Sequence, residues 1–184
     1  IASWYTKVNM FNFIKALREP LVLAFSTAAS EAALPIAMEK LERMGLPRNI
    51  VTFTLPLGYT FNLDGSTLYS CLATVFIAQV YGIPFPLEMQ LLMVLTLMLS
   101  TKGIAAVPGA SLIVIAGTAA SFGLPVEGIA IILGVDRLLD MARTCCNVTG
   151  NCIATLVVSK WEGQITADTI KFEGAEEKTT ATTF

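Results

Sequence analysis

A long apolar run near the end of the chain, residues 129–158, carries polar side chains that recur on one face of a helix. The run is long enough to cross a bilayer, which takes about 20 residues. On a helix that advances about 100° per residue, the polar side chains fall within an arc of roughly 100°, and Arg137 lies just outside it. They are Asp136, Asp140, Arg143, Thr144, Asn147 and Asn151.

A polar stripe on an apolar helix must face protein, water or a ligand, because a charge exposed to lipid is costly. One interpretation is a structural ion pair between Asp140 and Arg143, which are three residues apart. Such a pair does not need four further polar partners. The stripe therefore favours a polar ligand site at membrane depth.

The composition indicates a membrane protein, because 14% of the residues are charged and 54% are hydrophobic, whereas soluble domains carry about 25% charged residues. The chain has no histidine, so it lacks the usual general base and metal ligand. The net charge of −2 gives no support for nucleic-acid binding. The chain begins with Ile1 and shows no signal peptide, and we expect it to lack the N-terminal part of a larger protein.

Two segments are apolar but interrupted by small and polar residues. Residues 20–38 open with Pro20, close with Pro35 and carry a small polar tip, and residues 89–122 have a Pro/Gly-rich tip at 101–109. Each arm is too short to span a bilayer, so both segments are predicted to be re-entrant hairpins. Residues 1–19 are expected to be the end of a preceding helix and a connector, and residues 39–49 a charged, exposed connector.

The segment between the hairpins, residues 50–82, is predicted to be a spanning helix that unwinds at 58–66. Two glycines there flank Asn62 and Asp64, all poor helix formers. Freed carbonyls and the Asp64 carboxylate would form an oxygen-rich cation site; the alternative is a tight turn between two short helices. The order of hairpin and interrupted span, twice over, is typical of an inverted repeat. The polar end, residues 164–184, is expected to be disordered.

Several motifs in the right order resemble the dicarboxylate/amino acid:cation symporters, the glutamate transporter family. They are Asn62-Leu63-Asp64-Gly65, Ala106-Val107-Pro108-Gly109, Asp140-Met141-Ala142-Arg143-Thr144 and Asn147-Val148-Thr149-Gly150. The resemblance covers about residues 8–163 and is strongest to bacterial proton/glutamate–aspartate symporters.

This resemblance implies the fold and setting of the chain. It implies an all-α membrane protein in which residues 20–163 form the C-terminal part of a transport domain. That part would hold hairpins at 20–38 and 89–122, an unwound transmembrane helix at 50–82 and a polar-striped one at 129–158. It further implies a multi-pass protein of the cell membrane, the bacterial inner membrane, that forms a homotrimer, moves its substrate by an elevator motion, is not an enzyme and holds no resident cofactor.

The resemblance also assigns substrate roles. Arg143 would clamp the side-chain carboxylate of the substrate with its planar fork, and Asp140 would take the amino group. The remaining substrate-binding positions would be Thr144, Asn147, Ser30, Ser66, Val107 and Gly109. An acid beside an arginine implies L-glutamate or L-aspartate as the substrate.

Departures from the family pattern point to the coupling ion. Asn151 replaces an aspartate that binds sodium in sodium-coupled members, Leu63 replaces a methionine, and the Lys102 ammonium would compete with a cation. We therefore predict proton coupling, with Asp64, Asp136 or Glu31 as the carrier. Asn62 and Asp64 are kept, so one cation site is expected to be retained. The other candidates for cation coupling are Asn62, Gly58 and Thr60.

Other functions stay open on sequence alone. Within the family, a C4-dicarboxylate symporter would not need Asp140, and a sodium-coupled aspartate/glutamate symporter is a further alternative. A channel also uses broken helices. An intramembrane hydrolase built on Ser30 or Ser111 lacks a histidine, and a structural membrane protein leaves the polar stripe unexplained.

Overall fold

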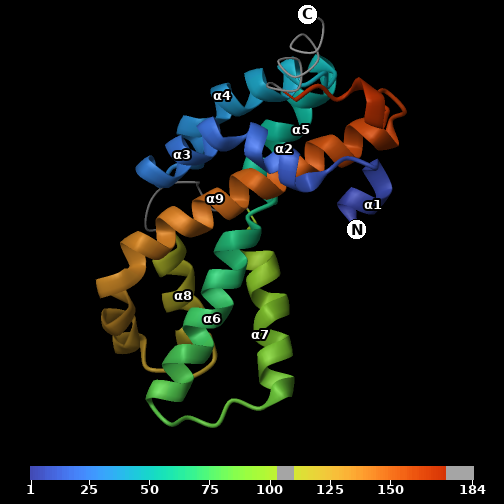
Figure 1. The fold of residues 1–184 in the computed structure, drawn as a ribbon. Helices are drawn as coiled ribbons and strands as arrows, with labels where there is room; N and C mark the ends of the chain where they lie inside the picture. Colours follow the sequence, from blue (N-terminus) through green and yellow to red (C-terminus); the bar gives the residue numbers. More distant parts are fainter. Residues whose placement is uncertain (103–109, 173–184) are drawn as a thin grey trace, which may run out of the picture.

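The computed structural model describes residues 1–102 and 110–172, and the regular elements within them are helices. The α-helices are α1 (Ala2–Thr6), α2 (Met10–Ala16), α3 (Arg18–Thr27), α4 (Ser30–Arg43), α5 (Arg48–Phe61), α6 (Asp64–Val80), α7 (Leu87–Ser100), α8 (Ala110–Ser121) and α9 (Ile129–Trp161). Two short 3-10 turns are η1 (Val126–Gly128) and η2 (Ala167–Thr169). Helix α9 runs through the molecule, with α1–α5 gathered around one half of it and α6–α8 around the other (Figure 1).

Where a re-entrant hairpin was predicted, at 20–38, the chain forms a pair of helices, α3 and α4, with its reversal at Ala28 and Ala29. Ala28 has a left-handed φ of 52°, and its N–H donates to the Ala24 carbonyl. Pro35 does not close this segment as predicted, because it lies inside α4. The strong helix formers that follow Pro35 continue the helix for two more turns despite the hydrogen bond that proline removes.

The predicted charged connector at 39–49 is therefore mostly helical. Helix α4 continues to Arg43, which pairs with Glu39 one turn earlier, and α5 already begins at Arg48. Ala37 and Leu41 lie on one face of α4 and are fully buried, so tertiary packing stabilises a segment whose charges suggested a solvent-exposed link. The N-terminal connector is helical as well, and Asn9 caps α2 by accepting from the N–H groups of Phe11 and Asn12.

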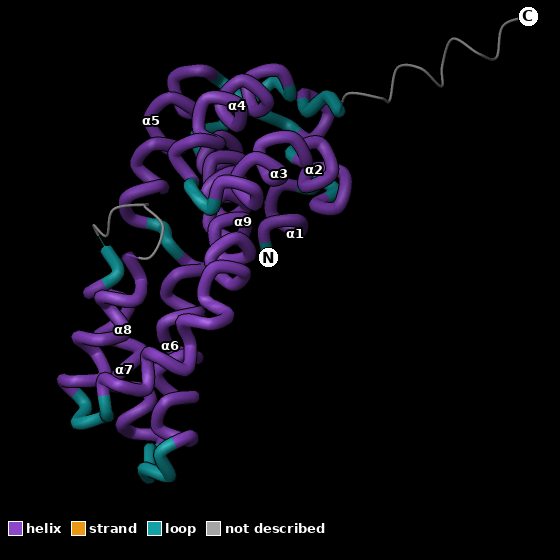
Figure 2. Tube along the Cα trace, turned by 90° about the vertical axis from the view of Figure 1, so that its left-hand side faces the viewer, coloured by secondary structure: helices purple, strands orange, loops and turns teal. Residues whose placement is uncertain are grey.

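The predicted interruption of the 50–82 segment is confirmed, but it is narrower than expected. Only Asn62 and Leu63 separate α5 from α6, and their φ/ψ values of −115°/71° and −100°/59° are not helical. The break lies where the chain passes from one half of the molecule to the other alongside α9 (Figures 1 and 2). It thus places the ends of two helices against the middle of the polar stripe.

The second predicted hairpin has its two arms, α7 and α8, which pack on each other and on α6. Most of its tip, residues 103–109, lies outside the described residues. The outer face of α7 is apolar and exposed over Leu91, Leu92, Leu95, Met98 and Leu99.

The predicted polar-striped helix is α9, which is continuous over 33 residues. Within residues 1–102 and 110–172, no helix combines the length and the apolarity that crossing a membrane requires. The expected spans at 50–82 and 129–158 are therefore not confirmed by the helices themselves. The break divides the first into helices of 14 and 17 residues, and the polar stripe reduces the apolarity of the second.

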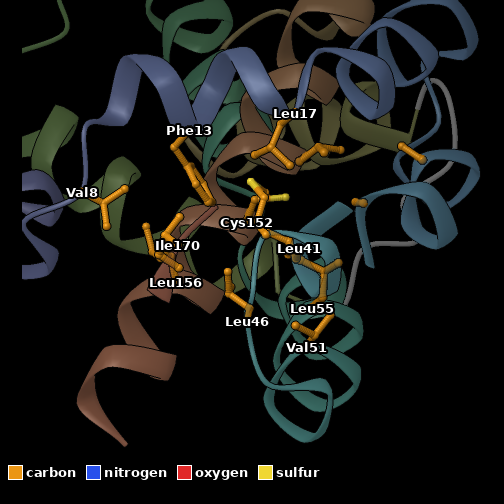
Figure 3. Packing of buried hydrophobic residues seen from close by; sticks show 14 of the residues in the cluster. Val8, Phe13, Leu17, Leu41, Leu46, Val51, Leu55, Cys152, Leu156 and Ile170 are labelled. Atoms are coloured by element: carbon orange, nitrogen blue, oxygen red, sulfur yellow. The ribbon is translucent and has the colours of Figure 1, made fainter. Parts of the chain in front are cut away.

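A core of fully buried side chains joins α2, α4, α5 and the second half of α9, with Cys152 beside Leu17 and Leu41 at its centre (Figure 3). A second cluster joins α6, α8 and the first half of α9. Residues 164–172, predicted as part of a disordered tail, instead close over the first core. Ile165 and Ile170 are buried there, and the Lys171 N–H donates to the Met44 carbonyl at 3.0 Å.

Candidate functional site

The stripe of α9 forms a buried polar surface, as the spacing predicted. Its six residues are 1–7% exposed, whereas Arg137 is exposed on the outside of the helix. They face the ends of α5 and α6 and the first hairpin, which pack on α9. Buried polar groups need hydrogen-bond partners, so the contacts of each side chain show which donors and acceptors are already paired.

Arg143 lies at the centre of the stripe and is 6% exposed. Its Nε and Nη2 both approach Asp140 Oδ1 at 2.9 Å, and its Nη1 lies 3.6 Å from Asp136 Oδ1. The Nη1 atom is buried and has no hydrogen-bond partner among the described residues. The structural ion pair considered from the sequence is thus present, yet it leaves one edge of the guanidinium fork without an acceptor.

Tyr69 of α6 completes this group and was not predicted from the sequence. Its hydroxyl donates to Asp136 Oδ1 at 2.6 Å, and the Arg143 guanidinium carbon lies 4.7 Å from its ring centroid, a cation–π contact. The sequence carried a weak signal, because Tyr69 follows Ser66 by three residues and so shares the buried face of α6.

Asn147 joins the stripe to the beginning of α6. Its Oδ1 accepts from the Gly65 N–H at 2.8 Å, and its Nδ2 donates to the Ser66 Oγ at 3.1 Å. Gly65 permits this approach, because a Cβ at that position would lie 2.5 Å from the Arg143 carbonyl oxygen. Two predicted substrate residues, Ser66 and Asn147, are therefore in direct contact across two helices.

The other predicted substrate residues are placed differently. The Thr144 hydroxyl donates to the Asp140 carbonyl at 2.7 Å, within its own helix. Ser30 is 3% exposed and is the first residue of α4, which packs on α9. Val107 and Gly109 lie outside the described residues.

A second polar group lies at the α5–α6 break. Asn62 Nδ2 donates to Asn151 Oδ1 at 2.9 Å, and Asn151 Nδ2 is buried without a partner. If the Asn62 amide is turned over, its nitrogen donates to the two Asp64 oxygens at 3.0 and 3.1 Å. The Asn151 amide must then turn as well, and this gives its nitrogen the Asn62 oxygen as an acceptor. The paired flip gives each amide nitrogen an acceptor and links Asn62 to the Asp64 carboxylate.

Glycines bring this group together. A Cβ on Gly58 would lie 2.7 Å from Asn151 Oδ1, and one on Gly150 would lie 3.2 Å from Asp64 Oδ2. Of the remaining cation-coupling candidates, Thr60 and Glu31 are exposed. The Lys102 ammonium donates to the Phe61 carbonyl at 2.6 Å, at the end of α5.

Broken helices whose ends meet buried polar side chains are the construction of secondary transporters. The comparison with known proteins agrees, because residues 1–161 match the Sodium:dicarboxylate symporter family. This chain belongs to that family, which is one of transporters and not of enzymes.

Individual relatives support the assignment. The chain is 54% identical over 157 residues to the "Proton/sodium-glutamate symport protein" of Geobacillus stearothermophilus, which is 85% of this chain and 37% of the relative. It is 52% identical over 155 residues to the "Proton/glutamate-aspartate symporter" of Escherichia coli, covering 84% and 36%. Against the "C4-dicarboxylate transport protein" of Rhodospirillum rubrum the identity is 44% over 169 residues, covering 91% and 38%. The chain thus spans less than two-fifths of the length of these relatives.

Proposed function

We propose that the protein containing this chain is a symporter of L-glutamate or L-aspartate with cations, working by an elevator motion. The observation that carries the proposal is the Nη1 atom of Arg143, a buried donor without a hydrogen-bond partner among the described residues. A buried guanidinium with an open edge is suited to a carboxylate, which it binds through two parallel hydrogen bonds. The two relatives of highest identity quoted above carry glutamate in their names.

Asp140 supports an amino acid over a dicarboxylate as the substrate. Its carboxylate shares the buried face with Arg143 and contacts it at 2.9 Å, so an ammonium group and a carboxylate of one small molecule can bind there side by side. A C4-dicarboxylate has no cation to offer Asp140 and would meet like charge. Transport of a C4-dicarboxylate, as in the name of the R. rubrum relative, is therefore the second candidate.

Polar groups around Arg143 would hold the rest of the substrate. Ser66 and Asn147 are hydrogen-bonded to each other. Thr144 is buried next to Arg143 on α9, and Ser30 is buried at the start of α4, which packs on α9. We propose that they bind the main-chain carboxylate and amino group, together with Val107 and Gly109 of the second hairpin.

Coupling is proposed to be to protons, carried by Asp136, Asp64 or Glu31. A proton carrier must be protected from water while it moves, and Asp136 is 7% exposed, whereas the side chains of Asp64 and Glu31 are exposed in this chain. Burial therefore makes Asp136→Asn the first variant to test. The Asn62–Asp64–Asn151 group is a further candidate for the site that binds a coupling cation.

The family assignment supports a location in the cell membrane, and we propose the bacterial inner membrane, a multi-pass topology and a homotrimer. The five leucine and methionine side chains that define the outer face of α7 are 49–78% exposed, and exposed apolar side chains gathered on one helix are typical of contacts with lipid or protein. Lipid, or other parts of the intact protein, would cover it.

The substrate proposal is tested by Arg143→Cys in the intact transporter in proteoliposomes. Loss of the guanidinium should abolish the uptake of labelled aspartate and glutamate, because the substrate side chain loses its counter-charge. Arg137→Cys is the matched control, since it removes an exposed arginine from the same helix and should leave uptake unchanged. Undiminished uptake by Arg143→Cys would contradict the proposal.

The unmodified protein serves to test the coupling ion and the alternative of a C4-dicarboxylate carrier. Labelled aspartate uptake is measured with an imposed proton gradient, with sodium, and with both. Strict dependence on external sodium would refute proton coupling. Unlabelled glutamate should compete with aspartate far better than succinate does, and the reverse order would favour the dicarboxylate carrier.

A further inference from the structure

The Phe61 carbonyl is an acceptor that the α5–α6 break sets free. In a continuous helix it would accept from the N–H of Gly65, four residues on. That N–H donates instead to Asn147 Oδ1 at 2.8 Å. The Lys102 Nζ donates to the Phe61 oxygen at 2.6 Å, so a side chain from another helix supplies the missing donor.

This carbonyl lies at the negative end of a helix. Phe61 is the last residue of α5, and α5 has no basic residue in its last turn. The carbonyls at such an end attract a positive charge, and transporters with broken helices use freed carbonyls at half-helix ends to hold a coupling cation. Here the positive charge comes from the end of α7, 41 residues further along the chain.

A second contact fixes the end of α7 at the break. Thr101, which is fully buried, lies with its hydroxyl 2.9 Å from the Thr67 hydroxyl in the first turn of α6. The two residues that follow α7 thus contact both sides of the break. Thr101 contacts the beginning of α6, and Lys102 contacts the end of α5. Among the described residues the structure records no carboxylate within salt-bridge distance of the Lys102 ammonium, so the carbonyl is its partner.

We infer that Lys102 is a tethered cation that takes the place of a mobile monovalent cation at the end of α5. The inference rests on the proposed function and deepens it, because it concerns how many free cations the carrier needs. With the ammonium in place, sodium gains nothing at the Phe61 carbonyl. Without it, the end of α5 has an unpaired oxygen and an uncompensated dipole, and a small cation can bind there.

Lys102→Met in the intact protein tests the inference without relying on transport. The midpoint of thermal unfolding is measured in sodium chloride and in choline chloride at equal ionic strength, with no substrate present. The difference between the two salts in the unmodified protein is the baseline, because it includes any sodium bound at the Asn62–Asp64–Asn151 group. Lys102→Met should unfold several degrees lower in choline chloride and regain most of the difference in sodium chloride, with a saturable dependence on sodium.

Two controls separate the local charge from general effects. Lys102→Arg keeps a positive donor and should behave as the unmodified protein does. Lys15→Met removes an exposed lysine of α2, far from the break along the chain, and should gain no sodium dependence. Aspartate binding, measured in parallel, should become sodium-dependent in Lys102→Met alone.

The inference is overturned if sodium shifts the unfolding temperature of Lys102→Met no more than that of the unmodified protein, whatever its uptake. If Lys102→Met does not fold, Lys102→Gln is taken through the same salts, and failure of sodium to recover either neutral variant also overturns the inference. If the unmodified protein proves unable to bind aspartate or glutamate, the proposed function fails, but the comparison of unfolding temperatures still decides the role of Lys102.

Discussion

The Tyr69 hydroxyl donates a 2.6 Å hydrogen bond to the Asp136 carboxylate. This bond gives Asp136 a neutral partner, so that Arg143 Nη1 stays 3.6 Å away and keeps its donor for another acceptor. The phenol of α6 therefore competes with the guanidinium for one carboxylate on α9, and we propose that this competition keeps Nη1 available to the substrate.

Tyr69→Phe tests this competition. Without the hydroxyl, Asp136 should draw Nη1 into a full hydrogen bond, and the substrate must then break it. We expect the dissociation constant for aspartate to rise about tenfold, which corresponds to about 1.4 kcal/mol, as isothermal titration calorimetry would measure. Tyr59→Phe is the matched control, because the buried Tyr59 hydroxyl has no partner among the described residues. Equal effects of the two changes would disprove the role of Tyr69.

Asn147→Ala should destabilise the protein by about 1–3 kcal/mol, because it leaves the buried Gly65 N–H without an acceptor. The readout is the free energy of unfolding in a denaturant that keeps the detergent micelle intact. Asn12→Ala removes an exposed asparagine of α2 and should cost far less. A loss for Asn147→Ala no larger than that for Asn12→Ala would show that the α6–α9 contact is not needed for stability.

Gly58→Ala should also destabilise the protein, in this case by overpacking. The added Cβ would meet Asn151 Oδ1 at 2.7 Å, and such crowding costs about 1–3 kcal/mol. Gly134→Ala has no atom within 4 Å to meet and lies inside α9, so it should stabilise by about 0.5–1 kcal/mol. Thermal unfolding of the two variants should therefore shift in opposite directions, and shifts of the same sign would contradict the geometry.

Asn151→Asp should introduce sodium stimulation of aspartate uptake. Asn151 is 1% exposed and faces the Asn62 amide at 2.9 Å, so a carboxylate there joins Asp64 in an oxygen-rich pocket that favours a cation. Asn49→Asp adds the same charge at an exposed position and should have no effect. If uptake by Asn151→Asp stays indifferent to sodium, this group does not bind the coupling ion.

The sequence predicted those features that depend on local periodicity and on helix breakers. The burial of Asp140, Arg143 and Asn147 on one face of α9 followed from the 3.6-residue repeat, and the break at Asn62 followed from residues that form helices poorly. Pro35 shows the limit of this reasoning. A proline counts as a stop signal, yet the buried face of α4 beyond it stabilises the helix by more than the lost hydrogen bond costs.

The sequence by itself therefore determined which polar side chains share the buried face of α9 and where the 50–82 segment breaks. Only the tertiary structure decided which of them meet. Tyr69 reaches Asp136 across 67 residues of chain, and Lys102 reaches Phe61 across 41. No periodic pattern encodes such pairs, because they depend on how α6 and α7 pack beside α9 and the end of α5. The physical reason is that hydrophobic packing places the helices, and the buried polar groups then bond to whatever donor or acceptor that packing brings within reach.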